Sequence, residues 1–196
     1  MVDVDGVVLN HPHAEGWSAD LQSACGISRA ELQACFFRPH WDDVVHGRAP
    51  LRKRLADALA QAAPHVSADR LIAYWFANDA HVDHDLLAQL GQVRRQGLEV
   101  HLATVQEHER AAYLWDVLRF RDHCDAMHYA ADLGCSKPAP EFFVAVEARS
   151  GFSAEEILFI DDKLANVEAA RARGWNAALW RRGRRLADLF EGLRQA

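Results

Sequence analysis

From Asp83 to the end of the chain, short apolar segments alternate regularly with amphipathic helical patterns, and few folds can satisfy that order. Four of the apolar segments have the length and composition of buried strands. Strands that alternate with helices predict a parallel sheet covered by helices on both faces. We therefore predict an α/β fold with a doubly wound parallel sheet, with strands near residues 98–104, 126–130, 157–160 and 177–180.

A further apolar segment, Met1 to Leu9, opens the chain and predicts one more strand of this sheet. Between residues 14 and 78 the pattern is helical throughout, with Ser28 and Ser67 in position to cap two of the helices. A small α-helical domain therefore interrupts the sheet domain in sequence. We place the α/β core at residues 1–12 and 82–196, and the helical domain at residues 13–81.

The first predicted strand carries two carboxylates. Asp3 and Asp5 are separated by one residue, and strand side chains two positions apart point to the same face. Gly6 then lets the backbone turn where a side chain would obstruct it. The strand would present both acids at the carboxyl edge of the sheet, where open α/β sheets bind ligands. Taken alone, this short pattern fits a turn with two solvated acids equally well.

Three further polar groups fall at strand ends or helix starts in the same layout. Thr104 ends a strand, and its hydroxyl and the backbone amides that follow it can bind an anion. Lys137 precedes a helix that we expect to begin at Pro138, and it supplies a positive charge for a phosphate and a carboxylate. Asp161 and Asp162 follow a strand, and carboxylate oxygens are ligands that Mg²⁺ prefers. Together these groups predict a phosphate and magnesium site.

In this order, the motifs resemble those of the haloacid dehalogenase superfamily, most of whose members are phosphatases. The resemblance covers nearly the whole chain, and it implies a Rossmann-like core with a helical cap of the type inserted after the first motif. Each motif is weak alone, but their order and their places on the predicted elements are specific. The motifs are Val2-Asp3-Val4-Asp5-Gly6-Val7, Leu102-Ala103-Thr104, Cys135-Ser136-Lys137-Pro138 and Phe159-Ile160-Asp161-Asp162, with Asn166 downstream.

The resemblance implies a two-step reaction. Asp3 would attack phosphorus and form an aspartyl-phosphate. Asp5 would protonate the leaving oxygen and later deprotonate the attacking water. Because Asp3 and the phosphate are both anionic, Mg²⁺ and Lys137 are needed to offset their repulsion.

The resemblance also implies the binding residues. Mg²⁺ would be held by the Asp3 carboxylate, the Asp5 backbone carbonyl and Asp162, with Asp161 beside it or linked through water. Asn166 would orient Lys137 from the next helix. The residues that would bind the phosphoryl group are Gly6, Thr104, Val105 and Lys137.

Asp5 favours a phosphatase over the dehalogenases of the superfamily, because a leaving alkoxide needs a proton and a leaving halide does not. We therefore expect a Mg²⁺-dependent phosphatase that acts on a small phosphorylated metabolite, a sugar phosphate or a nucleotide-like compound. A phosphomutase would use the same Asp3 and Asp5, so the sequence does not separate the two. A non-catalytic or regulatory binding protein is the third alternative, since Val105 replaces an asparagine that is common in relatives.

Side chains of the helical domain are candidates for substrate contacts. Trp17 and Trp41 follow loops near the expected entrance, although most aromatic residues there fit a hydrophobic core. His11 lies just past the predicted site, in a loop where a solvated histidine is the plainer interpretation. Arg48 follows Gly47 and is a candidate to reach for a substrate anion.

Composition restricts the partners. The formal net charge of −6 argues against nucleic acid, and no apolar run approaches the ~20 residues that span a bilayer. The four cysteines show no zinc-type spacing and fit free thiols, so we expect a cytoplasmic protein, monomeric or homodimeric. Just two residues precede Asp3, fewer than the family's first strand usually has, so a truncated or misassigned start is a further expectation.

Overall fold

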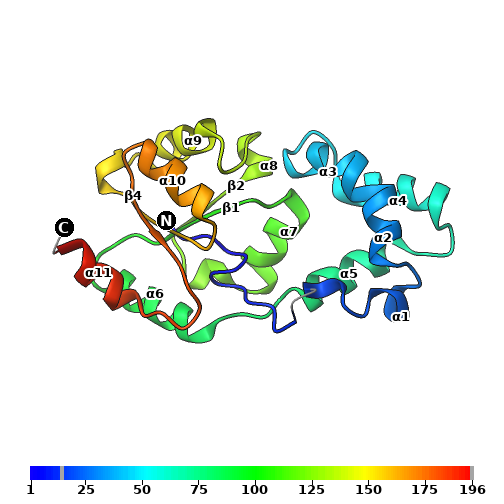
Figure 1. The fold of residues 1–196 in the computed structure, drawn as a ribbon, viewed down its shortest axis with the longest axis horizontal. Helices are drawn as coiled ribbons and strands as arrows, with labels where there is room; N and C mark the ends of the chain where they lie inside the picture. Colours follow the sequence, from blue (N-terminus) through cyan, green and yellow to red (C-terminus); the bar gives the residue numbers. More distant parts are fainter. Residues whose placement is uncertain (14–15, 195–196) are drawn as a thin grey trace.

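The computed structural model describes residues 1–13 and 16–194, and it shows a layered α/β unit beside a group of helices (Figure 1). Strands β1 and β2 pair in parallel, as do β3 and β4. Val2 forms parallel bridges to Leu102 of β1 and Ile160 of β3, so the N-terminal segment joins the two pairs. The doubly wound parallel sheet is thus confirmed, and its strands are β1 His101–Thr104, β2 Ala126–Tyr129, β3 Leu158–Asp161 and β4 Asn176–Leu179.

Helices cover both faces of this sheet (Figure 1). On one face lie α9 and α10; on the other lie α6, α7 and α11. Helix α7 continues directly into a π-helical turn, Tyr113–Val117. The helices of this unit are α6 His84–Arg95, α7 His108–Ala112, α8 Ala130–Leu133, α9 Pro140–Ser150, α10 Leu164–Ala172 and α11 Leu186–Arg194.

The predicted first strand, Met1 to Leu9, is wrong beyond Val4. There the chain folds back on itself, because the backbone N–H groups of Val8 and Leu9 both donate to the Val4 carbonyl, at 2.9 and 2.8 Å. Gly6 allows this turn with a φ of +83°. Val7 and Val8 are nonetheless fully buried. The apolar pattern therefore predicted the burial of these residues correctly, but it predicted an extended backbone where the chain forms a turn.

Helix α9 begins at Pro140, two residues later than predicted. Pro138 instead lies in a turn that the Ala139 N–H closes by donating to the Ser136 carbonyl, at 3.0 Å. Pro140 takes the first-turn position where a missing N–H costs nothing. The turn leaves Lys137 on a short loop between α8 and α9.

The helical unit has its own hydrophobic core of residues that include Leu21, Phe36, Leu55 and Ile72. Ser28 forms a capping box with Glu31, as its position predicts. Helix α2 runs without a break through a π-helical turn, Gln33–Phe37, into α3. The helical conformation therefore continues past Pro39. The helices of this unit are α1 Leu21–Cys25, α2 Arg29–Leu32, α3 Arg38–Val45, α4 Leu51–Ala62 and α5 Ala68–Asn78.

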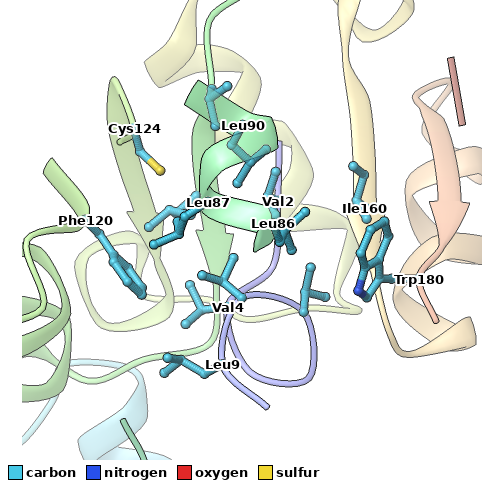
Figure 2. Packing of buried hydrophobic residues seen from close by; sticks show 14 of the residues in the cluster. Val2, Val4, Leu9, Leu86, Leu87, Leu90, Phe120, Cys124, Ile160 and Trp180 are labelled. Atoms are coloured by element: carbon cyan, nitrogen blue, oxygen red, sulfur yellow. The ribbon is translucent and has the colours of Figure 1, made fainter. Parts of the chain in front are cut away.

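The N-terminal segment lies at the centre of the sheet's core. Figure 2 shows Val2 and Val4 packed beside the α6 side chains Leu86 and Leu87, with Ile160 and Trp180 on the side of β3 and β4. A separate cluster, which includes Phe142, Phe159 and Trp175, packs α9 and α10 against the other face. Among the described residues, no helix is long and apolar enough to cross a membrane. Burial on both faces holds the backbone of Asp3 in a fixed position.

An apolar cavity of about 540 Å³ opens at the amino ends of β1 and β3, beside Met1, Leu90 and Phe190. The polar residues predicted from the sequence lie at the opposite, carboxyl ends of these strands. The candidate site and this cavity therefore lie at opposite edges of the sheet.

Two histidines are buried side by side on β1 and β2. Nδ1 of His101 lies 3.1 Å from Nε2 of His128, and Nε2 of His101 lies 2.8 Å from Glu99. Burial, the nearby His101 and Arg149, and the N-terminal amine lower the pKa of His128 to about 4, against a smaller opposing effect of Asp132. The folded protein therefore holds His128 neutral.

We expect His128 to make the fold acid-sensitive. The unfolded chain takes up a proton at His128 below pH 6.5, whereas the folded protein does so near pH 4, so stability falls as the pH drops through this window. In His128→Gln, urea unfolding between pH 7 and 4 should show a shallower loss of stability than the wild type. The exposed His84→Gln serves as control, and equal pH slopes in wild type and His128→Gln would refute this source of acid sensitivity.

Candidate active site

The carboxyl edge of the sheet gathers most of the predicted polar residues. Asp3 follows the bridging residue Val2, Thr104 ends β1 and Asp161 ends β3. The Asp3 backbone N–H donates to the Ile160 carbonyl at 2.9 Å, which sets Asp3 beside the end of β3. Parallel strands in register therefore place these three side chains at one edge, as the strand order requires.

The ammonium of Lys137 is the centre of this group. Its Nζ lies 2.9 Å from Oδ1 of Asp3 and 2.6 Å from Oδ2 of Asp161, and it donates to the Ala103 carbonyl at 2.8 Å. An ammonium has three N–H donors, so each of these partners accepts one. The Lys137 side chain is 1% exposed. A fully buried charge of this kind is stable only with such partners.

Asn166 contacts Asp161 and not Lys137, so the predicted orientation of Lys137 by Asn166 is indirect. Its Nδ2 donates to both Asp161 oxygens, at 3.1 and 2.9 Å. The backbone N–H of Lys163 also donates to Oδ1 of Asp161, at 2.8 Å. These three contacts fix the carboxylate of Asp161, which in turn holds Lys137.

The carboxyl of Asp3 is buried near two other carboxylates, and both conditions disfavour its charged form. Loss of solvation raises its pKa to about 7, although Lys137 acts in the opposite direction, and repulsion from Asp161 and Asp5 adds to the rise. Oδ1 already accepts from the Val4 N–H at 2.8 Å and faces Lys137, which leaves Oδ2 for other partners. A second positive charge near Asp3 would stabilise the carboxylate form.

A divalent cation fits beside Asp3. Oxygens of Asp3, Asp161 and Asp162 lie within 4.8 Å of one another. Oδ1 of Asp162 is buried and has no hydrogen-bond partner among the described residues. A Cβ at Gly6 would lie 2.3 Å from Oδ2 of Asp162, so glycine is needed for this close approach. An all-oxygen cluster with an unpaired carboxylate oxygen suits Mg²⁺.

Thr104 and Val105 lie at the same carboxyl edge of the sheet, at the end of β1 and just after it. The Thr104 hydroxyl is fully buried and has no hydrogen-bond partner among the described residues, so it is available to an anion. Val105 is half-buried and offers no polar side-chain atom.

Asp5 has a partner that the sequence analysis missed. Nε2 of Gln106 donates to Oδ2 of Asp5 at 2.7 Å, and Gln106 is buried. Its position, two residues after the threonine of the second motif, was the available signal. Asp5 itself is half-buried, and its side chain lies outside the three-carboxylate cluster.

The helical unit contacts the core next to Lys137. Nε2 of His46, just after α3, lies 3.1 Å from the Ser136 hydroxyl, and a Cβ at Gly47 would lie 2.3 Å from the Ala131 carbonyl oxygen. Arg52 in α4 contacts Glu109 in α7 at 2.9 Å. Sequence patterns gave no signal for these long-range contacts.

A buried arginine joins the two units on the side of Asp5. Arg110 in α7 donates to the carbonyls of Phe76, in α5, and Asp79, just after α5, at 2.9 and 2.7 Å, and it also lies 3.5 Å from Oδ2 of Asp79. Burial, with repulsion from Asp5, raises the pKa of Asp79 to about 6. The end of α5 is therefore close enough to Asp5 for their charges to interact.

The four residues predicted to contact substrate, three in the helical unit and His11 in the N-terminal segment, have other partners in this structure. Trp17 stacks on Trp75 with ring centroids 5.1 Å apart, and Trp41 lies 5.7 Å from Trp75, so both belong to an aromatic cluster of the helical unit. The His11 ring lies edge-on to His81 at 4.7 Å. Arg48 pairs with Asp43 at 2.9 Å and also with Asp42. Substrate contacts by these side chains stay predictions.

Replacing Gly6 should disrupt cation binding. In Gly6→Ala the new Cβ displaces the Asp162 carboxylate, so we expect the rise in melting temperature on adding Mg²⁺ to disappear. Gly183→Ala is the matched control, because its φ is also +83° but its Cβ would meet no atom within 4 Å. The control should lose just the ~1–2 kcal/mol of backbone strain and keep its Mg²⁺ response. An unchanged response in Gly6→Ala would contradict the cation site.

Removing the buried ammonium should weaken the fold. Lys137→Met leaves Asp3 and Asp161 buried without their counter-charge, which we expect to cost about 3–5 kcal/mol in the free energy of unfolding. Urea titration measures this change. The control is Lys53→Met, which removes an exposed ion pair with Asp57 and should leave the free energy of unfolding nearly unchanged. Equal losses in both variants would show that Lys137 is not structurally coupled to the carboxylates.

One curated protein resembles part of this chain in sequence, and several solved structures resemble it in fold. A D-ribitol-5-phosphate phosphatase of Bacteroides thetaiotaomicron is 35% identical over 66 residues, which are 31% of this chain and 32% of that protein. The match thus spans about a third of that curated relative. A haloacid dehalogenase-family enzyme of the same organism, solved with magnesium and inorganic phosphate, superposes with a TM-score of 0.80 at 18% identity over 96% of both chains.

A predicted HAD-like family hydrolase of Porphyromonas gingivalis gives a TM-score of 0.78 at 18% identity, covering 100% of this chain and 96% of that one. At these identities, the solved structures support the fold alone. The family model of haloacid dehalogenase-like hydrolases matches residues 1–174. The sheet order, the clustered carboxylates and this match agree, and the chain belongs to the haloacid dehalogenase-like hydrolases.

Proposed function

We propose that this protein is a Mg²⁺-dependent phosphatase that hydrolyses a small phosphomonoester through an aspartyl-phosphate. The observation that carries the proposal is the Lys137 ammonium, which lies 2.9 Å from Asp3 beside the three-carboxylate cluster. A nucleophilic carboxylate can approach an anionic phosphate when positive charge is fixed at the site. Magnesium, when bound by Asp3, Asp162 and Asp161, would supply the remaining charge.

In the first step, a carboxylate oxygen of Asp3 forms a bond to phosphorus, and the bond from phosphorus to the leaving oxygen breaks. Asp5 gives its proton to that oxygen, so an alcohol leaves. In the second step, Asp5 takes a proton from water, whose oxygen attacks phosphorus and releases Asp3. The Thr104 hydroxyl binds an oxygen of the phosphoryl group, and the charge of Lys137, held by Asp3, Asp161 and the Ala103 carbonyl, offsets the negative charge of that group. Asp161 and Asn166 hold Lys137 in place for both steps.

We further propose that residues 13–81 form a cap on a core of residues 1–12 and 82–196. The contacts of His46 with Ser136 and of Arg110 with α5 support this division, because they fasten the helical unit on either side of the site. A cap in this position excludes water during the first step and selects the leaving group. Asp5 and Asp79 contribute negative charge on the leaving-group side, of which Arg110, 3.5 Å from Asp79, offsets a part; a neutral polyhydroxy group therefore suits this side better than an anionic one.

The preferred substrate class is therefore a sugar or polyol phosphate. The named activity of the relative, D-ribitol-5-phosphate hydrolysis, belongs to the same class. A nucleotide-like substrate would bring further anionic groups toward Asp79.

The nucleophile is tested by replacing Asp3 with its amide. Asp3→Asn keeps the shape of the side chain but removes the attacking carboxylate, so we expect at least a ~10³-fold loss in kcat. The assay is Mg²⁺-dependent release of phosphate from p-nitrophenyl phosphate and from polyol phosphates. The exposed Asp57→Asn, on α4, should retain full activity. A folded Asp3→Asn protein that retains most of its activity would refute the mechanism.

A further inference from the structure

Gln106 lies in the loop between β1 and α7 and reaches across to the N-terminal segment. Its side-chain amide donates to Oδ2 of Asp5 at 2.7 Å. A carboxylate offers acceptors alone, so the amide nitrogen is the atom that must face it. Gln106 is 6% exposed, and its amide is therefore shielded from competing water.

The backbone on both sides of Gln106 is fixed. The Gln106 carbonyl accepts from the Ala131 N–H at the start of α8, at 3.1 Å. The next residue, Glu107, caps α7 by accepting from the N–H groups of Glu109 and Arg110. Thr104 anchors the other side as the last residue of β1. The amide therefore approaches Asp5 from a rigid support.

The backbone at Asp5 does not by itself fix the direction of the Asp5 carboxylate. It lies in the turn after Val4 and not in a regular strand. The charge of Asp5 repels that of Asp79, just after α5, and Arg110 offsets this repulsion in part from 3.5 Å. The donor on Oδ2 fixes the direction of the Asp5 carboxylate, since hydrogen bonds to a charged group are stronger than those between neutral groups.

We propose that Gln106 is a positioning residue that holds Oδ2 of Asp5 so that Oδ1 faces the leaving oxygen of the substrate. The proposal rests on the phosphatase function proposed above. In the first step the Oδ1–H bond breaks and the proton passes to the leaving oxygen as its bond to phosphorus breaks. Gln106 touches neither atom of this transfer. It acts through Asp5 by fixing the direction of the carboxylate.

This role has a signature that a purely structural role lacks. A p-nitrophenolate leaves as a stable anion and depends little on proton transfer, whereas a more basic leaving oxygen depends on it strongly. Misplacing Asp5 should therefore slow the hydrolysis of phenyl phosphate more than that of p-nitrophenyl phosphate. A general loss of folding or of phosphate binding would slow both substrates by the same factor.

The test compares p-nitrophenyl, p-chlorophenyl and phenyl phosphate in kcat/KM. Gln106→Met removes the donor at similar volume, and we expect its loss to be about tenfold larger on phenyl than on p-nitrophenyl phosphate, a part of the ~10²–10⁴-fold that general acids supply. Gln106→Glu replaces the donor by an acceptor at the same size and should steepen the series in the same way. The exposed Gln92→Met, on α6, is the control and should match the wild type.

A double-mutant cycle completes the test. If Gln106 acts through Asp5, adding Gln106→Met to Asp5→Asn should cause no further dependence on the leaving group. Equal losses across the series in both Gln106 variants, or a full additional effect in the Asp5→Asn background, would overturn the assignment of Gln106 and leave the phosphatase intact. If the folded wild type hydrolyses neither these three esters nor polyol phosphates, the proposed function is refuted and this inference with it.

Discussion

The buried ammonium of Lys137 is the interaction on which the site depends. It bridges Asp3 and Asp161, which come from distant parts of the sequence, and it also binds the end of β1 through the Ala103 carbonyl. Without this charge, two carboxylates at the carboxyl edge of the sheet would be buried and unpaired. In the proposed mechanism the same charge would lower the cost of bringing an anionic phosphate to Asp3. One side chain would then meet both the folding requirement and the chemical requirement.

The helical unit depends on this edge as well. Its contacts with the core lie at Ser136, beside Lys137, and at Arg110, on the side of Asp5. Between them the substrate's leaving group would meet Asp5, Gln106 and the end of α5. In our account the sheet supplies the charge for phosphoryl transfer, and the helical unit determines which alcohol leaves.

Much of this arrangement was predictable from sequence, because strand ends carry local signals. Asp161, Thr104 and Lys137 follow or precede apolar segments in a recognisable order, and the parallel sheet then brings them together. The turn after Val4 was not predictable, because burial on all sides gives the same apolar pattern for a strand and for a turn. The Gln106 contact with Asp5 and the Arg110 contact with α5 were also missed, since they join residues far apart in sequence.

In the proposed mechanism, Asp3 carries the phosphoryl group during turnover. Acyl phosphates are reduced by borohydride, so enzyme quenched in acid during hydrolysis and then reduced should contain homoserine at position 3, detectable by peptide mass spectrometry. We predict this product at Asp3 when both Mg²⁺ and substrate are present, and not when either is left out. Turnover with no modified Asp3, or with the modification at another carboxylate, would contradict the account.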